Sequence, residues 1–160
     1  MMKATSWKIL AGVAIGLALL TIGLILIFRA DRMPDLSNAI CQPGDLGRRY
    51  QRLDELSPVM PAQLQETIVE SDTVSLIDAQ MTYTMLTCQI YRFENETVAR
   101  RAFEAVCVNQ TEATLQVGDE ACTLAGNAPQ NLAFRRNNYL VLMRGDVTVL
   151  PAEAVDTRLR

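Results

Sequence analysis

The chain has 160 residues and a formal net charge of −3, from 15 lysines and arginines against 18 aspartates and glutamates, and it contains no histidine. The absence of histidine excludes Ser-His-Asp and Cys-His catalysis, and also the zinc sites that use histidine ligands. The acidic balance argues against nucleic acid as a partner, because nucleic-acid binding needs a basic surface.

The N-terminal region carries a long uncharged and mostly apolar segment, residues 9–28. At about 1.5 Å rise per residue, a helix of this length would cross the roughly 30 Å hydrocarbon layer of a bilayer. Residues 28–32 (FRADR) are bulky and charged, which makes a poor signal-peptide cleavage site. We therefore expect an uncleaved transmembrane helix over residues 9–28, with the lipid bilayer as a partner.

The orientation of this helix follows from the segments on either side of it. Only residues 1–8 precede the span, whereas a long following segment translocates with little regard to its charge. This predicts a single-pass membrane protein with a cytoplasmic N-terminus and an extracytoplasmic C-terminal domain. Gly12 and Gly16 form a GxxxG pattern that could let two such helices dimerise, although glycine is common in membrane helices in general.

The segment after the predicted span divides into a linker and a domain. Residues 29–44 are rich in turn-forming residues and predict a juxtamembrane linker, so the domain would cover residues 45–160. Residues 46–56 fit either a loose helical face or a short strand, and residues 61–70 fit a short helix with proline in its first turn. Residues 74–93 alternate apolar and polar side chains, which predicts one long bent strand or a tight hairpin.

The second half of the domain has more definite patterns. Residues 97–109 show the apolar stripe of an amphipathic helix, and residues 117–124 fit a short strand. Residues 147–150 continue the sheet in this interpretation, and Pro151 begins a terminal helix that extends to residue 160.

A β-hairpin is predicted over residues 131–144. Asn137 and Asn138 stand between two apolar runs, and asparagine tolerates the positive φ of a two-residue type I′ turn. The order of all these elements predicts an α+β fold, in which the transmembrane helix is followed by a small antiparallel sheet with helices on one side.

The four cysteines are Cys41, Cys88, Cys107 and Cys122. They have no short metal-ligand spacing, so we expect no metal site, and an even number in a translocated domain predicts two disulfides. Cys107 would end the predicted helix and Cys122 follows one loop later, which suggests the pairs Cys107–Cys122 and Cys41–Cys88. The alternative is four buried free thiols that pack as small hydrophobic side chains.

Asp119 and Glu120 are the strongest candidates for a carboxylate pair. Two carboxylates can act as general acid and base when their environments separate their pKa values. Neighbouring residues on a strand point to opposite faces, however, so the two would not share a site. A cross-strand ion pair with Arg135 or Arg136 is the preferred interpretation.

Three segments together resemble a known group of proteins. Residues 117–121 (VGDEA), residues 134–137 (FRRN) with the strand 139–143, and the helix 98–103 (VARRAF) are similar to bacterial membrane-anchored or lipoprotein extracytoplasmic domains of unknown function. In those domains the hairpin more often has glycine where this chain has Asn138. The resemblance covers the C-terminal half and implies a small α+β domain outside the cytoplasm, and it implies no reaction.

Taken together, these patterns predict a non-catalytic binding or interaction module that is stapled by disulfides and needs no cofactor. Its partner would be a protein, a second copy bound through the membrane helix, or a small ligand. The alternatives are a structural subunit of an envelope complex and an enzyme that uses carboxylates or thiols.

Overall fold

The computed structural model describes residues 34–160 with the exception of residues 48, 54–61, 81–83, 126–130 and 147. The predicted cytoplasmic segment 1–8, the predicted span 9–28 and its Gly12 and Gly16 lie outside the described residues. Within the described residues, no helix is both long enough and apolar enough to cross a membrane. This corrects the predicted localisation, because single-pass membrane anchoring is not supported.

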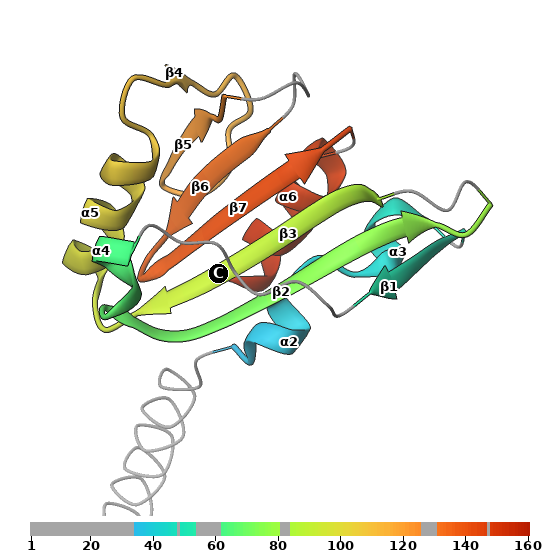
Figure 1. Cartoon of the computed structure of the whole chain (residues 1–160), viewed down its shortest axis with the longest axis horizontal. Helices are drawn as coiled ribbons and strands as arrows, with labels where there is room; N and C mark the ends of the chain where they lie inside the picture. The colour runs from blue at the N-terminus through green and yellow to red at the C-terminus, as the bar shows by residue number, and fades with distance from the viewer. Residues whose placement is uncertain (1–33, 48, 54–61, 81–83, 126–130, 147) are drawn as a thin grey trace, which may run out of the picture. The chain divides into compact units, whose positions relative to one another are not determined.

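The fold is built on a seven-stranded sheet whose paired strands are all antiparallel, in the spatial order β1-β2-β3-β7-β6-β5-β4 (Figure 1). Its two longest strands, β2 and β3, are neighbours in the sheet and pair as an extended hairpin. The strands are β1 (Tyr50–Leu53), β2 (Ile68–Asp78), β3 (Thr84–Phe93), β4 (Thr111–Glu112), β5 (Glu120–Thr123), β6 (Leu132–Arg136) and β7 (Tyr139–Gly145).

Helices cover both faces of this sheet. One face packs against α5 (Glu96–Val106), with α4 (Ala62–Gln65) beside it (Figure 1). The opposite face packs against α6 (Val149–Arg158), together with the short helices α2 (Leu36–Ala39) and α3 (Pro43–Leu46). The predicted fold class is therefore wrong in two respects: the helices lie on both sides of a larger sheet, and the described chain contains no membrane-spanning helix.

The segment predicted as a linker belongs to the folded unit from residue 34 onward. Leu36 and Ile40 are fully buried in the core beneath α6, and their segment forms α2 and α3. Helices of four residues carry no measurable apolar periodicity, so the tertiary contacts rather than the local sequence give this segment its structure.

Three other boundaries differ from the predictions. The ambiguous segment 46–56 contains strand β1, and the helix predicted over 61–70 is limited to α4, because β2 already begins at Ile68. The predicted strand extension at residues 147–150 is also wrong, since α6 begins at Val149 and places Pro151 in its first turn.

The helix α5 and the β6–β7 hairpin are confirmed, although α5 ends at Val106 and not at residue 109 as predicted. Asn95 caps α5 by accepting a hydrogen bond from the Val98 amide, and the stripe of small and aromatic side chains is buried on the sheet. The hairpin turns at residues 137 and 138. Asn137 has a φ of 53° and is the only one of the two with a positive φ, so the turn lacks the second positive φ of the predicted type I′ turn.

Candidate functional site

A group of charged side chains surrounds the β6–β7 hairpin, where the sequence analysis placed Asp119 and Glu120. Arg135 is 1% exposed and points to the α5 face. Its Nη1 lies 3.1 Å from Asp119 Oδ2 and 3.3 Å from Glu96 Oε1, and its Nε donates to Glu120 Oε2 at 3.1 Å. Three carboxylates thus surround one buried guanidinium. Their negative charges compensate the cost of burying the positive charge of Arg135.

Arg136 points to the opposite face and binds α6. Its Nε and Nη2 donate to the two carboxylate oxygens of Asp156 at 2.7 and 2.9 Å, and its Nη1 donates to Asp119 Oδ1 at 2.7 Å. Arg160 Nη2 also donates to Asp156, at 2.9 Å. Asp119 therefore contacts both arginines and links the two faces of the sheet at the end of the hairpin.

The charges in this group shift two pKa values. Burial is the largest single influence on Asp156 and favours the neutral acid, but the hydrogen bonds and charges of Arg136 and Arg160 outweigh it and lower the pKa of Asp156. The hydrogen bond to Asp156 in turn raises the pKa of Arg136. Both side chains are therefore ionised at neutral pH.

Gly118 brings the Asp119 loop against strand β6. Its φ is +68°, and a Cβ atom at this position would overlap the carbonyl oxygen of Arg135. The next amide, of Asp119, donates to that same carbonyl at 2.6 Å. Glycine therefore permits the close approach that sets Asp119 beside the two arginines.

These contacts confirm the predicted cross-strand ion pairs. Asp119 and Glu120 both contact Arg135, so the prediction that the two carboxylates would not share a site is wrong. Strand β5 begins only at Glu120, and Asp119 in the preceding loop can reach the same guanidinium. A pocket of about 360 Å³ lies beside the group, between residues 112–121 and the side chains of Arg136 and Arg160. Asp119 and Asp156 already pair with these arginines, and Glu112 and Glu120 also line the pocket, so the lining has no excess of positive charge for an anion.

The cysteines form the two predicted bridges, Cys41–Cys88 and Cys107–Cys122. Cys41 and Cys88 are fully buried, and the bridge ties the segment of α2 and α3 to the central strand β3. Cys107–Cys122 ties the end of α5 to β5 on the other face. Among the described residues, no group of three or more His, Cys, Asp or Glu side chains could hold a metal ion.

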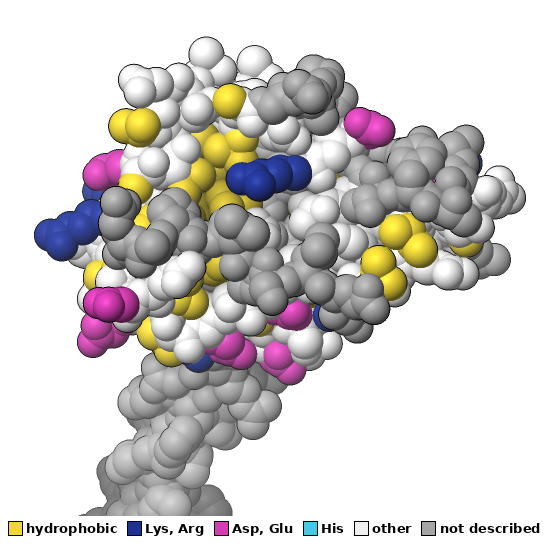
Figure 2. Space-filling model, viewed as in Figure 1, with side chains coloured by type: hydrophobic (Ala, Val, Ile, Leu, Met, Phe, Trp, Pro, Cys, Tyr) yellow, Lys and Arg dark blue, Asp and Glu magenta, His cyan; other side chains and the backbone are white. Residues whose placement is uncertain are grey.

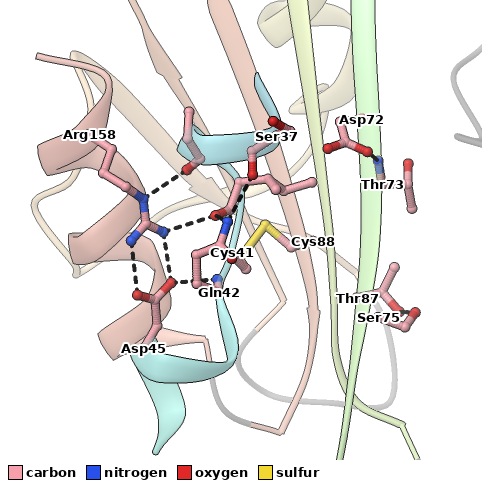
Figure 3. The surroundings of a disulfide bond; sticks show 12 residues. Ser37, Cys41, Gln42, Asp45, Asp72, Thr73, Ser75, Thr87, Cys88 and Arg158 are labelled. Atoms are coloured by element: carbon pink, nitrogen blue, oxygen red, sulfur yellow. Dashed lines mark hydrogen bonds and ion pairs between the residues drawn. A yellow bond between two sulfur atoms is a disulfide. The ribbon is translucent and has the colours of Figure 1, made fainter. Parts of the chain in front are cut away.

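A group of hydrogen bonds from Arg158 lies beside the Cys41–Cys88 bridge (Figure 3). Arg158, near the end of α6, donates to both carboxylate oxygens of Asp45 at 2.9 and 2.7 Å. The same guanidinium donates to the backbone carbonyls of Ala39 and Ile40 at 3.1 and 3.0 Å. These bonds satisfy carbonyl groups at the end of α2 and fix the segment against α6.

The middle of the α5 face differs from the rest of the sheet because its side chains are polar. The cross-strand register places Thr73 beside Gln89, and places Ser75 and Arg144 on either side of Thr87. Paired residues in an antiparallel sheet share a face, so these side chains form one group with Tyr91, which lies two residues beyond Gln89. We call this group the polar patch: Thr73, Ser75, Thr87, Gln89, Tyr91 and Arg144.

Most of the polar patch is buried, and it is incompletely hydrogen-bonded. Tyr91 is fully buried and Thr73 is 7% exposed, yet neither the Tyr91 hydroxyl nor Thr73 Oγ1 has a hydrogen-bond partner among the described residues. The Ser75 and Thr87 hydroxyls form a hydrogen bond, with 3.3 Å between their oxygens. Burial raises the pKa of Tyr91 to about 12, against a smaller opposing effect of Arg144. The Tyr91 hydroxyl therefore remains protonated at neutral pH.

Apolar side chains border the polar patch. Leu140 and Leu142 on β7 share its face and join the cluster that packs under α5. Figure 2 shows hydrophobic side chains gathered on this face, with a basic side chain among them. Figure 3 shows Ser75 and Thr87 on the other side of β2 and β3 from Cys41 and Arg158.

Sequence reasoning missed the polar patch. The alternation in residues 74–93 predicts strand, which β2 and β3 confirm, and its polar positions are those expected to face water in a half-buried sheet. A signal was present nonetheless, because threonine, serine, glutamine and tyrosine fill this stripe at Thr73, Ser75, Thr87, Gln89 and Tyr91 with no charged residue among them. Charged side chains are almost never fully buried unless they are paired, so a polar stripe without charges is compatible with burial.

Comparison of the chain with models of protein families, with curated proteins and with solved structures finds no match in any of the three. The resemblance to bacterial extracytoplasmic domains through the VGDEA segment and the FRR hairpin therefore stays a prediction. Functional inference depends on the geometry of the described residues.

Proposed function

We propose that the protein is a non-catalytic binding module, stapled by two disulfides, that holds a small ligand on the polar patch of the α5 face. The observation that carries this proposal is the pair of buried hydroxyls, of Tyr91 and Thr73, that have no partner among the described residues in the middle of a regular sheet.

The energetic argument starts from the cost of an unpaired hydroxyl. A buried polar group without a hydrogen bond costs about 1–3 kcal/mol, and most buried polar groups in proteins are paired. Two such hydroxyls on the adjacent strands β2 and β3 are therefore unfavourable in a purely structural face. A ligand that bonds to them would recover this free energy.

The surroundings of the patch support the same function. Small-molecule sites combine apolar walls with a few polar groups that fix orientation. Here the buried side chains of Leu140 and Leu142 form apolar surroundings, and Tyr91 and Thr73 provide hydroxyls that can donate or accept. The patch also stands on regular strands, which position side chains more rigidly than loops do.

A nuclear magnetic resonance screen of the full chain against a mixed library of small polar and amphiphilic fragments tests this proposal. Fragments that bind should shift the amide signals of residues 71–75, 87–91 and 140–144 together. Replacing both hydroxyls, with Thr73→Val and Tyr91→Phe, should weaken these fragments about tenfold or more. Hits that cluster elsewhere, or whose affinity the double variant leaves unchanged, would contradict the proposal.

A second function, docking of a protein partner, is favoured by a different surface. Val149 and Leu150 at the start of α6 are 42% and 60% exposed. A pocket of about 110 Å³ lies next to them, with Ala113, Leu115 and Leu132 in its lining. Exposed apolar side chains beside a small pocket are typical of a site that receives an apolar anchor residue.

This second function predicts self-association or complex formation that depends on Leu150. Sedimentation of the wild-type protein and a Leu150→Glu variant over a wide concentration range measures it. A wild-type protein that stays monomeric at high concentration would argue against a role as a structural subunit formed from its own copies.

A further inference from the structure

We propose that the pocket beside Val149 and Leu150 binds an extended segment of a protein partner that carries one aliphatic side chain between basic residues. This inference rests on the second function proposed above, docking of a protein partner, and it adds the chemistry of the segment that docks. The aliphatic side chain is inferred from the pocket, a hydrogen bond to the partner's backbone from Asn131, and the basic residues from the charges around the pocket.

The pocket has the size and the lining for one aliphatic side chain. Its volume is about 110 Å³, and an engineered apolar cavity of roughly 150 Å³ holds benzene. The described residues of the lining carry no charge, and four of them are apolar: Ala113, Leu115, Leu132 and Val149. Leu150, the residue after Val149, is 60% exposed and extends the apolar surface at the start of α6. An aliphatic side chain placed here would bury apolar surface on both molecules.

Asn131 provides a polar group in this pocket that the fold does not use. The residue is 6% exposed, and its Oδ1 accepts a hydrogen bond from the Gly145 amide at 3.1 Å, which sets the orientation of the side-chain amide. Its Nδ2 carries two hydrogens and donates to none of the described residues. A buried donor without an acceptor is costly, and the backbone carbonyl of an extended segment supplies an acceptor. Asn131 therefore favours a peptide segment over a purely apolar molecule.

The surroundings of the pocket are acidic. Glu112 precedes Ala113 of the lining, Asp146 lies just before α6, and Glu153 lies one helical turn beyond Val149. All three acidic side chains are exposed, and none forms an ion pair with a described residue. Basic side chains on either side of the docked aliphatic residue would therefore meet unpaired carboxylates.

The net charge of the folded unit favours a different protein over a second copy as the occupant. Residues 34–160 contain 11 arginines and no lysine against 17 aspartates and glutamates, a difference of −6. Arg136 and Arg160, which line the neighbouring pocket, already pair with Asp119 and Asp156. Two copies would bring like charges together at this surface, whereas a basic segment is attracted to it.

Four synthetic peptides test the inference on the full chain by nuclear magnetic resonance. Three are nine residues long with capped ends and a central leucine, which is flanked by lysines in the first, glutamates in the second and serines in the third. The fourth is the lysine peptide with alanine in place of leucine. The lysine–leucine peptide should shift the amide signals of residues 113–115, 131–132 and 148–150, and bind about tenfold more tightly than the glutamate and alanine peptides. Equal affinity for either of those two peptides would overturn the inference.

Two sets of variants locate the charge effect. Glu112→Gln/Asp146→Asn/Glu153→Gln should weaken the lysine–leucine peptide about tenfold and leave the serine peptide unchanged, because each exposed ion pair contributes a small amount. The matched control removes three exposed acids on or beside α4 and α5, in the variant Glu66→Gln/Glu94→Gln/Glu104→Gln. This control should bind both peptides as the wild type does. Equal losses in the two variants would mean attraction by net charge alone and would overturn the inference.

Asn131→Asp tests the proposed hydrogen bond. It keeps an acceptor for the Gly145 amide, removes the Nδ2 donor and adds a negative charge. General electrostatics would therefore strengthen the lysine–leucine peptide, whereas loss of the donor should weaken it about tenfold. An affinity that stays the same or rises would contradict the role of Asn131.

Sedimentation of the wild type and Leu150→Glu separates failure of this inference from failure of the second function. If the wild type self-associates through Leu150 and binds none of the peptides, docking at this surface stands, its occupant is a second copy, and this inference is wrong. If no peptide binds and Leu150→Glu changes no association, both the inference and the second function are wrong.

Discussion

The two faces of the sheet are built from the same strands and differ sharply in chemistry. Strands β2 and β3 send Val74, Cys88 and Ile90 to the α6 face, where all three are fully buried among other apolar side chains. The positions between them send Thr73 and Gln89 to the α5 face, where they are buried but polar. The strand alternation thus divides one hairpin into an apolar side and a polar side.

The interactions that hold the two faces together differ as well. The α6 face contains the Cys41–Cys88 disulfide and the ion pair between Arg158 and Asp45. The polar patch of the α5 face has two hydroxyls without partners among the described residues. The α5 face also has a bridge, Cys107–Cys122, and the α6 face also has an unpaired buried hydroxyl, that of Tyr139. The difference between the faces is therefore one of position: the unpaired hydroxyls of the α5 face lie together in a polar stripe, whereas the α6 face is apolar around the Cys41–Cys88 bridge.

The largest expected effect comes from removing the bridge of the α6 face. Replacing Cys41 and Cys88 by alanine should lower the free energy of unfolding by about 4 kcal/mol, because the loss of loop entropy grows with the length of the closed loop. The native Cys107–Cys122 bridge closes a shorter loop, with a sequence separation of 15 residues against 47, so the Cys107→Ala/Cys122→Ala variant should lose about 3 kcal/mol. Urea unfolding of both variants measures the difference, and the reverse ranking would refute this account of the α6 face.

A smaller effect is expected where the two faces are joined. Asp156→Asn should destabilise the protein by about 2 kcal/mol at neutral pH, because it leaves Arg136 with one carboxylate partner instead of two. Glu153→Gln on the same helix, where the side chain is exposed, should change stability by less than about 0.5 kcal/mol.

The pH dependence of stability gives a second measure of Asp156. Its pKa in the folded protein lies below the ordinary value of 3.8, so its stabilising contribution is complete above that value and is lost as the pH falls through the lowered pKa. Thermal melts from pH 6 to pH 2 should show a shallower acid decline for Asp156→Asn than for wild type. Parallel declines would show that Asp156 does not contribute to acid denaturation.

The smallest effect on stability is expected at the polar patch. Tyr91→Phe removes an unpaired hydroxyl and should leave the stability at neutral pH unchanged or raise it by up to about 1 kcal/mol. Tyr139→Phe, which removes an unpaired hydroxyl on the α6 face, should behave in the same way. Only Tyr91→Phe should lower the affinity of fragments for the polar patch. Equal affinities in the two variants would contradict a binding role that is specific to the α5 face.

The stability of the protein at alkaline pH provides an independent test of the burial of Tyr91. The folded pKa of about 12 exceeds the ordinary value of 10.0, so the contribution of the neutral phenol is complete below pH 10 and is lost as the pH rises toward 12. Chemical unfolding at pH 9, 10 and 11 should show a smaller loss of stability for Tyr91→Phe than for wild type. Identical losses would contradict the burial of an ionisable phenol at this position.

The parts of this fold that the sequence predicts are those with local signals. Asn95 marks the start of α5 by its capping side chain, and the asparagine pair at residues 137 and 138 marks the hairpin. The ion pairs of Asp119 and Glu120 followed from strand adjacency. In each case, the residues that determine the structure are close together in the chain or paired by one hairpin.

The remaining parts depend on contacts between distant segments. Residues 34–46 look like a linker, but burial of Leu36 and Ile40 under α6 makes them core. Whether the polar stripe of β2 and β3 faces water or protein depends on what covers it, which period-two alternation does not reveal. Helix coverage of both faces could not be predicted for the same reason, because a strand pattern records polarity and not the position of distant helices.

The Cys41–Cys88 bridge also determines how a pulling force would pass through the molecule. A force applied between residue 34 and residue 160 would reach Cys41, cross the sulfur atoms to Cys88 and continue along β3 toward α6. The enclosed segment, with β1 and β2, would carry no tension along its own backbone while the covalent bond holds. Thr73 lies inside this shielded loop, and Tyr91 and Arg144 lie outside it. Under load the two parts of the polar patch would therefore differ, because the strands that carry Tyr91 and Arg144 bear tension and the loop that carries Thr73 does not.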